Sequence, residues 1–263
     1  FHHALAYAQD RKQGKTAAPA EKDTILGHAD VRRMLTTMKA EVFAARAIAV
    51  CNAVAIDMAT ATGDKAWKAR AALLTPITKA FGTDTGIEVA DMGLQVHGGM
   101  GFIEETGAAQ FCRDVRVTAI YEGTNGIQAM DLVARKMMDG GEAAMTLLDE
   151  IEEDVEAARA VFPRLAGDVW DACESMREAT EWLVSQSDLQ NRFAGAVPYL
   201  HAFARVLGGH LHLKAAVADR GGAREKLARF YIQRMLPEYT ALLAHAQAGA
   251  EDLYALTAEE LAG

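Results

Sequence analysis

Apolar residues recur at helical spacing along most of this chain. Between residues 29 and 62 they return at every third or fourth position, which predicts a long helix with one apolar face, ended by Gly63-Asp64. A second stretch of this kind runs from about Lys65 to Val96. Pro76 is expected to bend this second helix, and the glycines at 98, 99 and 101 are expected to end it.

The rest of the chain continues the helical pattern. Residues 1–14 are expected to be helical, and residues 15–28 lack any period and are expected to form a surface loop. A short helix should follow Glu122 and end at Asp139-Gly140-Gly141. Further helices are expected near residues 142–161, 165–187, 190–219, 222–248 and 250–261. Because runs of alternating β-branched residues are missing, the predicted fold class is all-α, with one domain over residues 1–140 and another over 141–263.

Composition narrows the class of protein further. The chain has 263 residues, of which 51% are hydrophobic and 24% charged, as in ordinary globular proteins. Its formal net charge of -9 argues against a nucleic-acid partner, which would require clustered Lys and Arg. Cys51, Cys112 and Cys173 are widely spaced and suggest a reducing, cytoplasmic location. No uninterrupted apolar run reaches the roughly 18 residues of a membrane span, so no membrane partner is expected.

The segment Ile120-Tyr121-Glu122-Gly123-Thr124-Asn125-Gly126-Ile127-Gln128 carries the strongest chemical signal. In this segment one carboxylate, that of Glu122, follows a run of mostly apolar residues and precedes a Gly-Thr turn at which a helix is expected to begin. The apolar neighbours predict that Glu122 is desolvated, which would make it a better base for a carbon-bound proton. Gly123 would let a ligand approach the backbone, and Thr124 can cap the helix that follows. The alternative is a surface glutamate before an ordinary helix start.

Two other segments have the residue types of anion sites. Gly98-Gly99-Met100-Gly101 can form a nest of backbone donors at a helix junction, although a simple helix end has the same pattern. A helix precedes it rather than a strand, so it does not satisfy the dinucleotide-binding fingerprint. Arg11-Lys12-Gln13-Gly14-Lys15 can clamp a phosphate, the alternative being a solvated helix end.

The histidines do not predict a metal site. His210 and His212 stand two residues apart on a predicted helix and therefore point in nearly opposite directions. His97 adjoins the glycine segment and is a weaker candidate for contact with a cofactor phosphate.

These three segments occur together within residues 1 to about 139, with Arg113-Asp114 between the glycine segment and Glu122. In this order and spacing they resemble the C-terminal helical domain of acyl-CoA dehydrogenases. Residues 141–263 resemble the added helical region of the longer members. The resemblance implies an all-α four-helix bundle followed by a second helical region. It also implies that the family's N-terminal helical and β-domains are absent, so this chain, which opens on Phe1-His2-His3, is expected to be a fragment that is inactive alone.

The resemblance also implies a reaction and its site residues. The family converts an acyl-CoA thioester to the trans-2-enoyl-CoA with FAD, which receives the β-hydrogen as hydride. Glu122 would be the base that removes the α-proton, and Tyr121 and Gly123 would border the substrate. The residues expected to contact FAD are Thr124 and Asn125, together with Arg11, Gln13, Gln95, Gly98 and Gly99, the last five for FAD bound mainly to the opposite subunit.

The same resemblance implies a homodimer or a dimer of dimers that passes electrons to an electron-transfer flavoprotein. Two positions depart from the family pattern: Thr or Ser is common where Gln13 stands, and Gln is common where Gly126 stands. Two alternatives remain open. One is an acyl-CoA oxidase that uses oxygen. The other is a binding or protective module, acting on nucleic acid, for which the local basic cluster is Arg224, Lys226, Arg229 and Arg234.

Overall fold

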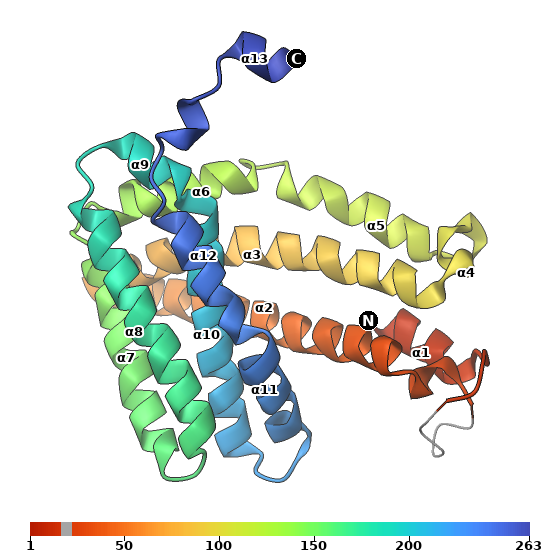
Figure 1. The fold of residues 1–263 in the computed structure, drawn as a ribbon. Coiled ribbons are helices and arrows are strands. Elements are labelled where there is room, and N and C mark those ends of the chain that lie inside the picture. Colours follow the sequence, from red (N-terminus) through yellow and green to blue (C-terminus); the bar gives the residue numbers. More distant parts are fainter. Residues whose placement is uncertain (17–22) are drawn as a thin grey trace. The chain divides into compact units, whose positions relative to one another are not determined.

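The computed structural model describes residues 1–16 and 23–263 (Figure 1). Within these residues the regular elements are helices and 3₁₀ turns, with one isolated bridge between Lys12 and Thr24. The all-α prediction is therefore confirmed. The loop predicted at residues 15–28 includes residues 17–22, which lie outside the described residues, and its last part contains the 3₁₀ turn η2 (Ile25–Gly27).

The helices follow one another along the whole described chain. The longest are α2 (Ala29–Thr62) and α3 (Lys65–His97), preceded by α1 (His2–Asp10). The other elements are α4 (Gly99–Phe102), η3 (Glu104–Thr106), α5 (Ala108–Arg116), η4 (Val117–Ala119), α6 (Asn125–Val133), η5 (Arg135–Met137), α7 (Glu142–Arg159), α8 (Pro163–Ser185), α9 (Leu189–Ala194), α10 (Ala196–Ala218), α11 (Ala223–Arg234), η6 (Leu236–Glu238), α12 (Tyr239–Ala246), η7 (Asp252–Tyr254) and α13 (Ala258–Ala262).

The two long helices end close to where the sequence predicts. Gly63, with a φ of 72°, stops α2, and the Oδ1 atom of Asp64 accepts the backbone N–H of Ala66 at 2.8 Å at the start of α3. Pro76 lies inside α3 without ending it. Gly98 ends α3 as expected, but Gly99 and Gly101 do not act as terminators, because they form the short helix α4.

The chain divides into two compact units that share the long helices. Unit 1 contains Phe1–Arg46 and Gly82–Glu122, and unit 2 contains Ala47–Phe81 and Gly123–Gly263. In unit 1 a core of small and flexible apolar residues joins α1 to the first half of α2 and the second half of α3. Its buried members are Ala4, Ala8, Ile25, Met34, Leu35, Met38, Val89 and Val96.

Unit 2 is built around α10. This helix packs against α6, α7, α8, α11 and α12, and α7 packs against α8 (Figure 1). Buried polar groups on α10 are paired with its neighbours: the hydroxyl groups of Tyr199 and Thr180 share a hydrogen bond of 2.8 Å that links α10 to α8. Because α10 is covered on several sides, its apolar residues are buried around most of its circumference.

Two helices expected to be continuous in unit 2 are broken. The stretch 190–219 divides into α9 and α10 at Gly195, where a Cβ atom would lie 2.0 Å from the carbonyl oxygen of Ala246. The stretch 222–248 divides into α11 and α12 at the turn η6, which contains Pro237. The spacing of apolar residues shows neither break. The first depends on the close approach of α12 to Gly195, and the second occurs at the turn that contains Pro237.

Helix α2 is the one helix of the described residues that is long and apolar enough to cross a membrane by length and composition. Of the 18 most apolar consecutive residues of α2, 28% are buried. The sequence has no uninterrupted apolar run here, because charged residues such as Arg46 interrupt the apolar stretch of α2. Core helices of globular proteins share this length and composition, so the observation by itself assigns no membrane role.

Candidate active site

Glu122 occupies a left-handed turn ahead of α6. Its φ is 53° and that of Gly123 is 86°, so two consecutive residues lie in the region that favours glycine. A non-glycine residue held there costs on the order of 1–3 kcal/mol, and such strain persists only where the surroundings hold the backbone. Such residues cluster at ligand-binding and catalytic sites.

The expected desolvation of Glu122 is wrong for the chain as described, because its side chain is exposed. Three of the apolar residues that precede it are exposed as well: Val117 is 55%, Ile120 52% and Tyr121 51% accessible, whereas Ala119 is buried. The apolar stretch before Glu122 therefore does not bury the carboxylate. Apolar residues next to a carboxylate in the sequence are able to shield it from water. Whether they do so depends on the direction in which the fold points their side chains.

Within unit 2, the residues that follow Glu122 are held by α3. The Nζ atom of Lys79 donates to the carbonyl oxygen of Gly123 and to Oδ1 of Asn125, each at 2.8 Å. The Nδ2 atom of Asn125 donates to the carbonyl oxygen of Ala80 at 3.2 Å. Both ends of the Asn125 amide therefore make contacts inside the chain. Thr124 caps α6, since its Oγ1 atom accepts the backbone N–H of Ile127 at 3.4 Å.

The glycine segment forms an open turn in unit 1. Gly98 has a φ of 59° and its N–H donates to the carbonyl of Gln95 at 3.0 Å. A Cβ atom on Gly98 or Gly99 would meet no atom within 4 Å, so space for a ligand lies next to the backbone. Gly101 differs, because a Cβ atom there would lie 2.2 Å from the carbonyl oxygen of Leu94. The side chain of Gln95 is exposed beside this turn.

The candidate phosphate clamp is also in unit 1. Arg11 and Gln13 follow α1, and both are exposed. Their backbones are fixed even so: the Arg11 carbonyl accepts the N–H of Ile25 at 2.8 Å, and the Gln13 carbonyl lies 2.7 Å from Nε2 of His28. The structure therefore holds the backbone of this segment and leaves both side chains accessible.

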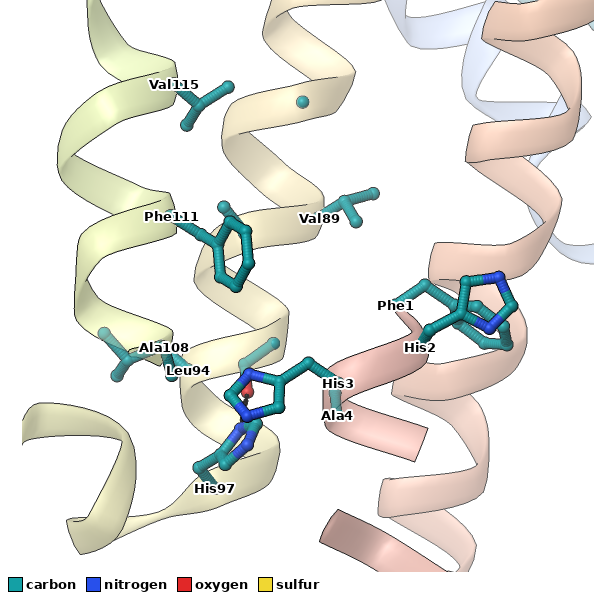
Figure 2. A pocket seen from close by; sticks show the side chains of 13 residues that line it. Phe1, His2, His3, Ala4, Val89, Leu94, His97, Ala108, Phe111 and Val115 are labelled. Atoms are coloured by element: carbon teal, nitrogen blue, oxygen red, sulfur yellow. Dashed lines mark hydrogen bonds between the residues drawn. The ribbon is translucent and has the colours of Figure 1, made fainter. Parts of the chain in front are cut away.

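A cavity of about 330 Å³ lies between α1, α3 and α5 in unit 1 (Figure 2). His97 lies at its edge, 4% exposed, with its ring 4.6 Å from that of His3 and 4.5 Å from that of Tyr7. Its Nδ1 atom donates to the carbonyl of Gly93 at 2.7 Å, and its Nε2 atom is buried without a hydrogen-bond partner among the described residues. Burial, followed by repulsion from His97, lowers the pKa of His3. His97 thus packs inside unit 1, and no contact here supports its role as a phosphate ligand.

Arg113 belongs to a local ion pair. Its two terminal nitrogens lie 2.7 and 2.8 Å from the carboxylate oxygens of Glu104, which connects α5 to η3. Both side chains are more than half exposed. The pair positions the turn between the glycine segment and α5.

The predicted site residues fall in both units. Arg11, Gln13, Gln95, Gly98, Gly99, Tyr121 and Glu122 belong to unit 1, and Gly123, Thr124 and Asn125 belong to unit 2. Sequence reasoning missed Lys79. A single cation among the buried residues Ile77, Ala80 and Phe81 was the available signal, because a charge in such a setting requires a partner.

The basic cluster of the alternative interpretation lies on α11. Within that cluster, Arg229 is paired with Glu225 at 2.8 Å, and the guanidinium of Arg234 stands 5.9 Å from the ring of Phe230. Part of its charge is therefore neutralised inside the helix, which weakens the case for a nucleic-acid surface.

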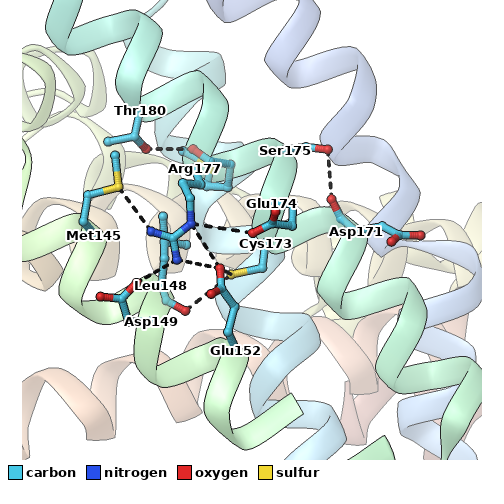
Figure 3. A network of polar contacts seen from close by, with 11 residues as sticks. Met145, Leu148, Asp149, Glu152, Asp171, Cys173, Glu174, Ser175, Arg177 and Thr180 are labelled. Carbon is cyan, nitrogen blue, oxygen red and sulfur yellow. Dashed lines mark hydrogen bonds and ion pairs between the residues drawn. The ribbon is translucent and has the colours of Figure 1, made fainter. Parts of the chain in front are cut away.

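Polar networks in unit 2 connect helices rather than form a metal site. Arg177 of α8 binds Glu152 and Asp149 of α7 at 2.5 and 2.8 Å (Figure 3). Asp154 of α7 accepts from His210 and Lys214 of α10, at 2.8 and 2.7 Å. His212 instead stacks on Tyr231, at 4.4 Å between ring centroids. Within the described residues, no group of three or more metal-ligating side chains occurs.

Two family models match nearly all of the chain. The model described as "Acyl-CoA dehydrogenase, C-terminal domain" matches residues 1–138, and the model described as "Acetyl-CoA dehydrogenase C-terminal like" matches residues 147–257. The first covers the turn at Glu122 and the glycine segment, and the second covers the helices around α10.

Curated relatives are similar along most of the chain. The 3-methylmercaptopropionyl-CoA dehydrogenase of Ruegeria pomeroyi is 36% identical over 92% of this chain and 45% of its own length. A butyryl-CoA dehydrogenase of Syntrophomonas wolfei subsp. wolfei is 30% identical, over 90% of this chain and 43% of its own. FadE5 of Mycobacterium tuberculosis, a broad-specificity linear acyl-CoA dehydrogenase, is 29% identical, over 92% and 45%. The chain thus spans less than half the length of these relatives.

Solved structures share the fold. ACDH-11 of Caenorhabditis elegans in complex with C11-CoA has a TM-score of 0.73 over 87% of this chain and 39% of that one. An acyl-CoA dehydrogenase of Bacillus anthracis complexed with FAD has a TM-score of 0.71 over 92% and 44%. Both are 19% identical in sequence, so they support the fold alone. The family-model matches and the relatives together show that this chain belongs to the acyl-CoA dehydrogenase family.

Proposed function

We propose that the protein containing this chain catalyses the FAD-dependent α,β-dehydrogenation of an acyl-CoA thioester to the trans-2-enoyl-CoA. The observation that carries the proposal is the strained turn at Glu122 and Gly123, within the part of the chain that the acyl-CoA dehydrogenase model matches. Strain at a carboxylate-bearing turn is expected where a side chain must be held for chemistry.

The residues present are compatible with FAD. Gly98 and Gly99 leave open space beside their backbone, and the exposed guanidinium of Arg11 can pair with phosphate oxygens. Gln13 and Gln95 are exposed as well. The proposed FAD-binding residues of the chain are these five, together with Thr124 and Asn125. Because the Asn125 side chain binds Lys79 and Ala80, its contribution would come from the backbone.

Glu122 would remove the α-proton, and the electron pair of the broken C–H bond would pass into the thioester as an enolate. Bound FAD supplies an acceptor for the β-hydrogen as hydride. The backbone amide at Glu122 would donate to the thioester carbonyl, because a donor aimed at the developing negative charge lowers the barrier. Tyr121 and Gly123 would border the substrate, and Gly123 offers no side chain to obstruct it.

Anaerobic titration of the full-length protein with acyl-CoAs of graded length tests this proposal, with the visible absorption of the flavin as the readout. Loss of that absorption with one class of thioester is the expected result. Glu122→Gln should still bind the thioester and leave the flavin oxidised, whereas Glu105→Gln, at an exposed glutamate outside the turn, should behave like the wild type. A flavin that no thioester reduces would overturn the proposal and favour a binding module.

The titration should include 3-methylmercaptopropionyl-CoA, because a 36% identical relative is named for it. The proposed assembly is a homodimer or dimer of dimers in the cytoplasm, and the proposed electron acceptor is an electron-transfer flavoprotein. Rapid reoxidation of the reduced flavin by oxygen, with peroxide formed, would instead identify an oxidase.

A further inference from the structure

Lys79 is a cation in an apolar part of α3. Its neighbours Ile77, Ala80 and Phe81 are each at most 2% exposed, and Lys79 itself is partly buried. A lysine ammonium has three donors and is costly to withdraw from water without acceptors. At this position the chain must supply those acceptors.

The acceptors belong to the segment directly after Glu122. Nζ of Lys79 lies 2.8 Å from the Gly123 carbonyl oxygen and 2.8 Å from Oδ1 of Asn125. The Asn125 amide then returns to α3 by donating to the Ala80 carbonyl at 3.2 Å. Two neighbouring residues of α3 therefore hold both the peptide after Gly123 and the first residue of α6.

These bonds act on the strained backbone. The Gly123 carbonyl can accept from Lys79 only while the peptide after it keeps its orientation, and that orientation is tied to the left-handed Gly123, whose φ is 86°. Glu122 is the preceding residue, with a φ of 53°. Hydrogen bonds from a charged donor are stronger than neutral ones and are well suited to hold such a turn.

We propose that Lys79 is a positioning residue for the base Glu122, acting by holding the Gly123 carbonyl and the Asn125 side chain. This inference rests on the proposed dehydrogenation. In this role Lys79 acts through its bonds to Gly123 and Asn125, which limit the orientations available to the turn from which the carboxylate extends. Misplacement of a reacting group by about 1 Å can cost about 100-fold in rate.

The test uses α-proton exchange in the full-length flavoprotein, which reports on the base without hydride transfer. The probe is 3,3-dimethylbutyryl-CoA in D₂O, since its α-carbon carries hydrogens and its β-carbon carries none. Glu122 takes an α-proton, the carboxyl group exchanges with solvent, and a deuteron returns to the enolate. Mass spectrometry measures the incorporated deuterium at saturating thioester, and a separate titration gives the dissociation constant.

Lys79→Met removes the charge and keeps most of the stem. We expect it to slow exchange on the order of 10- to 100-fold, with the thioester dissociation constant and FAD content changed by less than about threefold. Lys79→Arg should restore part of the rate, because a guanidinium can donate to both acceptors. Lys68→Met, at an exposed lysine of the same helix, should match the wild type.

An exchange rate of Lys79→Met within about threefold of the wild type at saturation would overturn the positioning role. If Lys79→Met does not fold, Asn125→Ala removes the side-chain bonds of Asn125 with Lys79 and Ala80: slower exchange at unchanged FAD content supports the proposal, and unchanged exchange overturns it. Failure of the proposed function has a different signature, namely that the wild type does not exchange or that exchange persists in Glu122→Gln.

Discussion

The Nε2 atom of His210 lies 2.8 Å from Oδ2 of Asp154, so a buried histidine of α10 is joined to a half-buried carboxylate of α7. Burial lowers the pKa of His210, and the hydrogen bond with Asp154 opposes this effect without reversing it. The pKa of Asp154 is lowered as well: burial raises it, but hydrogen bonds from Lys214 and His210 outweigh the burial. Because both pKa values are lowered, the pair at neutral pH is a neutral imidazole that donates a hydrogen bond to an ionised carboxylate.

This pairing predicts a loss of stability in mild acid. Below the ordinary histidine value of 6.5, the unfolded chain binds a proton that folded His210 resists, so stability should fall as the pH drops through and below that value. His210→Gln keeps a donor for Asp154 and does not titrate. Urea unfolding at about pH 7.5 and about pH 5.5 should show a smaller decrease for the variant than for the wild type. Equal decreases would mean that His210 is not responsible.

Removal of the carboxylate should be more harmful than removal of its exposed partner. Asp154→Ala leaves buried His210 without its acceptor, which we expect to cost on the order of 1–3 kcal/mol in the free energy of unfolding. Lys214 is 54% exposed, so Lys214→Met should cost at most about 1 kcal/mol. Glu153→Ala, on the exposed side of α7, is the matched control for helix α7. A loss for Glu153→Ala as large as that for Asp154→Ala would contradict this account.

Removal of the Arg177 guanidinium should lower the stability of the fold. Glu152 and Glu174 both lie beside this guanidinium, at 2.5 and 3.6 Å (Figure 3). The pKa of Glu174 is raised by burial and by its hydrogen bond to Glu152. Arg177→Met should destabilise the fold by about 2–4 kcal/mol, because it leaves neighbouring carboxylates uncompensated. Adding Glu174→Gln should recover part of the loss in thermal unfolding; no recovery would show that the carboxylates do not repel one another.

Alanine substitutions at Gly99 and Gly101 should differ in their effect on stability. Gly101→Ala would place a Cβ atom 2.2 Å from the Leu94 carbonyl oxygen, so the backbone must move, and we expect a cost of about 2–4 kcal/mol. Gly99→Ala meets no atom within 4 Å and should change the stability of the chain by less than about 0.5 kcal/mol. Thermal unfolding of both variants measures this difference. Similar unfolding midpoints for the two variants would mean that the Leu94 carbonyl does not lie as close to Gly101 as the structure shows.

The three cysteines should react at different rates. Cys173 is fully buried, and burial, with the neighbouring Glu152, raises the pKa of its thiol to about 12. Cys51 is exposed and Cys112 partly exposed, although burial also raises the pKa of each. A disulfide reagent at neutral pH should label Cys51 and Cys112 in the native protein and Cys173 only after unfolding. Peptide mapping by mass spectrometry identifies the sites; early labelling of Cys173 would reveal local opening between α7 and α8.

Local patterns were enough for the two longest helices and for the family. The limits of α2 and α3 follow from apolar period and from Gly63 and Gly98, because these signals lie within the residues they describe. The order of the segments at Arg11, Gly98 and Glu122 was sufficient to indicate the acyl-CoA dehydrogenases, which the family models confirm. The roles of those residues, and the domain division at residue 140, stay predictions.

Contacts between distant residues were decided by the tertiary structure. The exposure of Glu122, the break at Gly195 against Ala246 and the bonds from Lys79 to Gly123 and Asn125 all depend on how one helix meets another. The period of a sequence states which side of a helix is apolar, since side-chain direction repeats every 3.6 residues. It does not state which partner will cover that side, so burial, strain and pairing had to come from the fold.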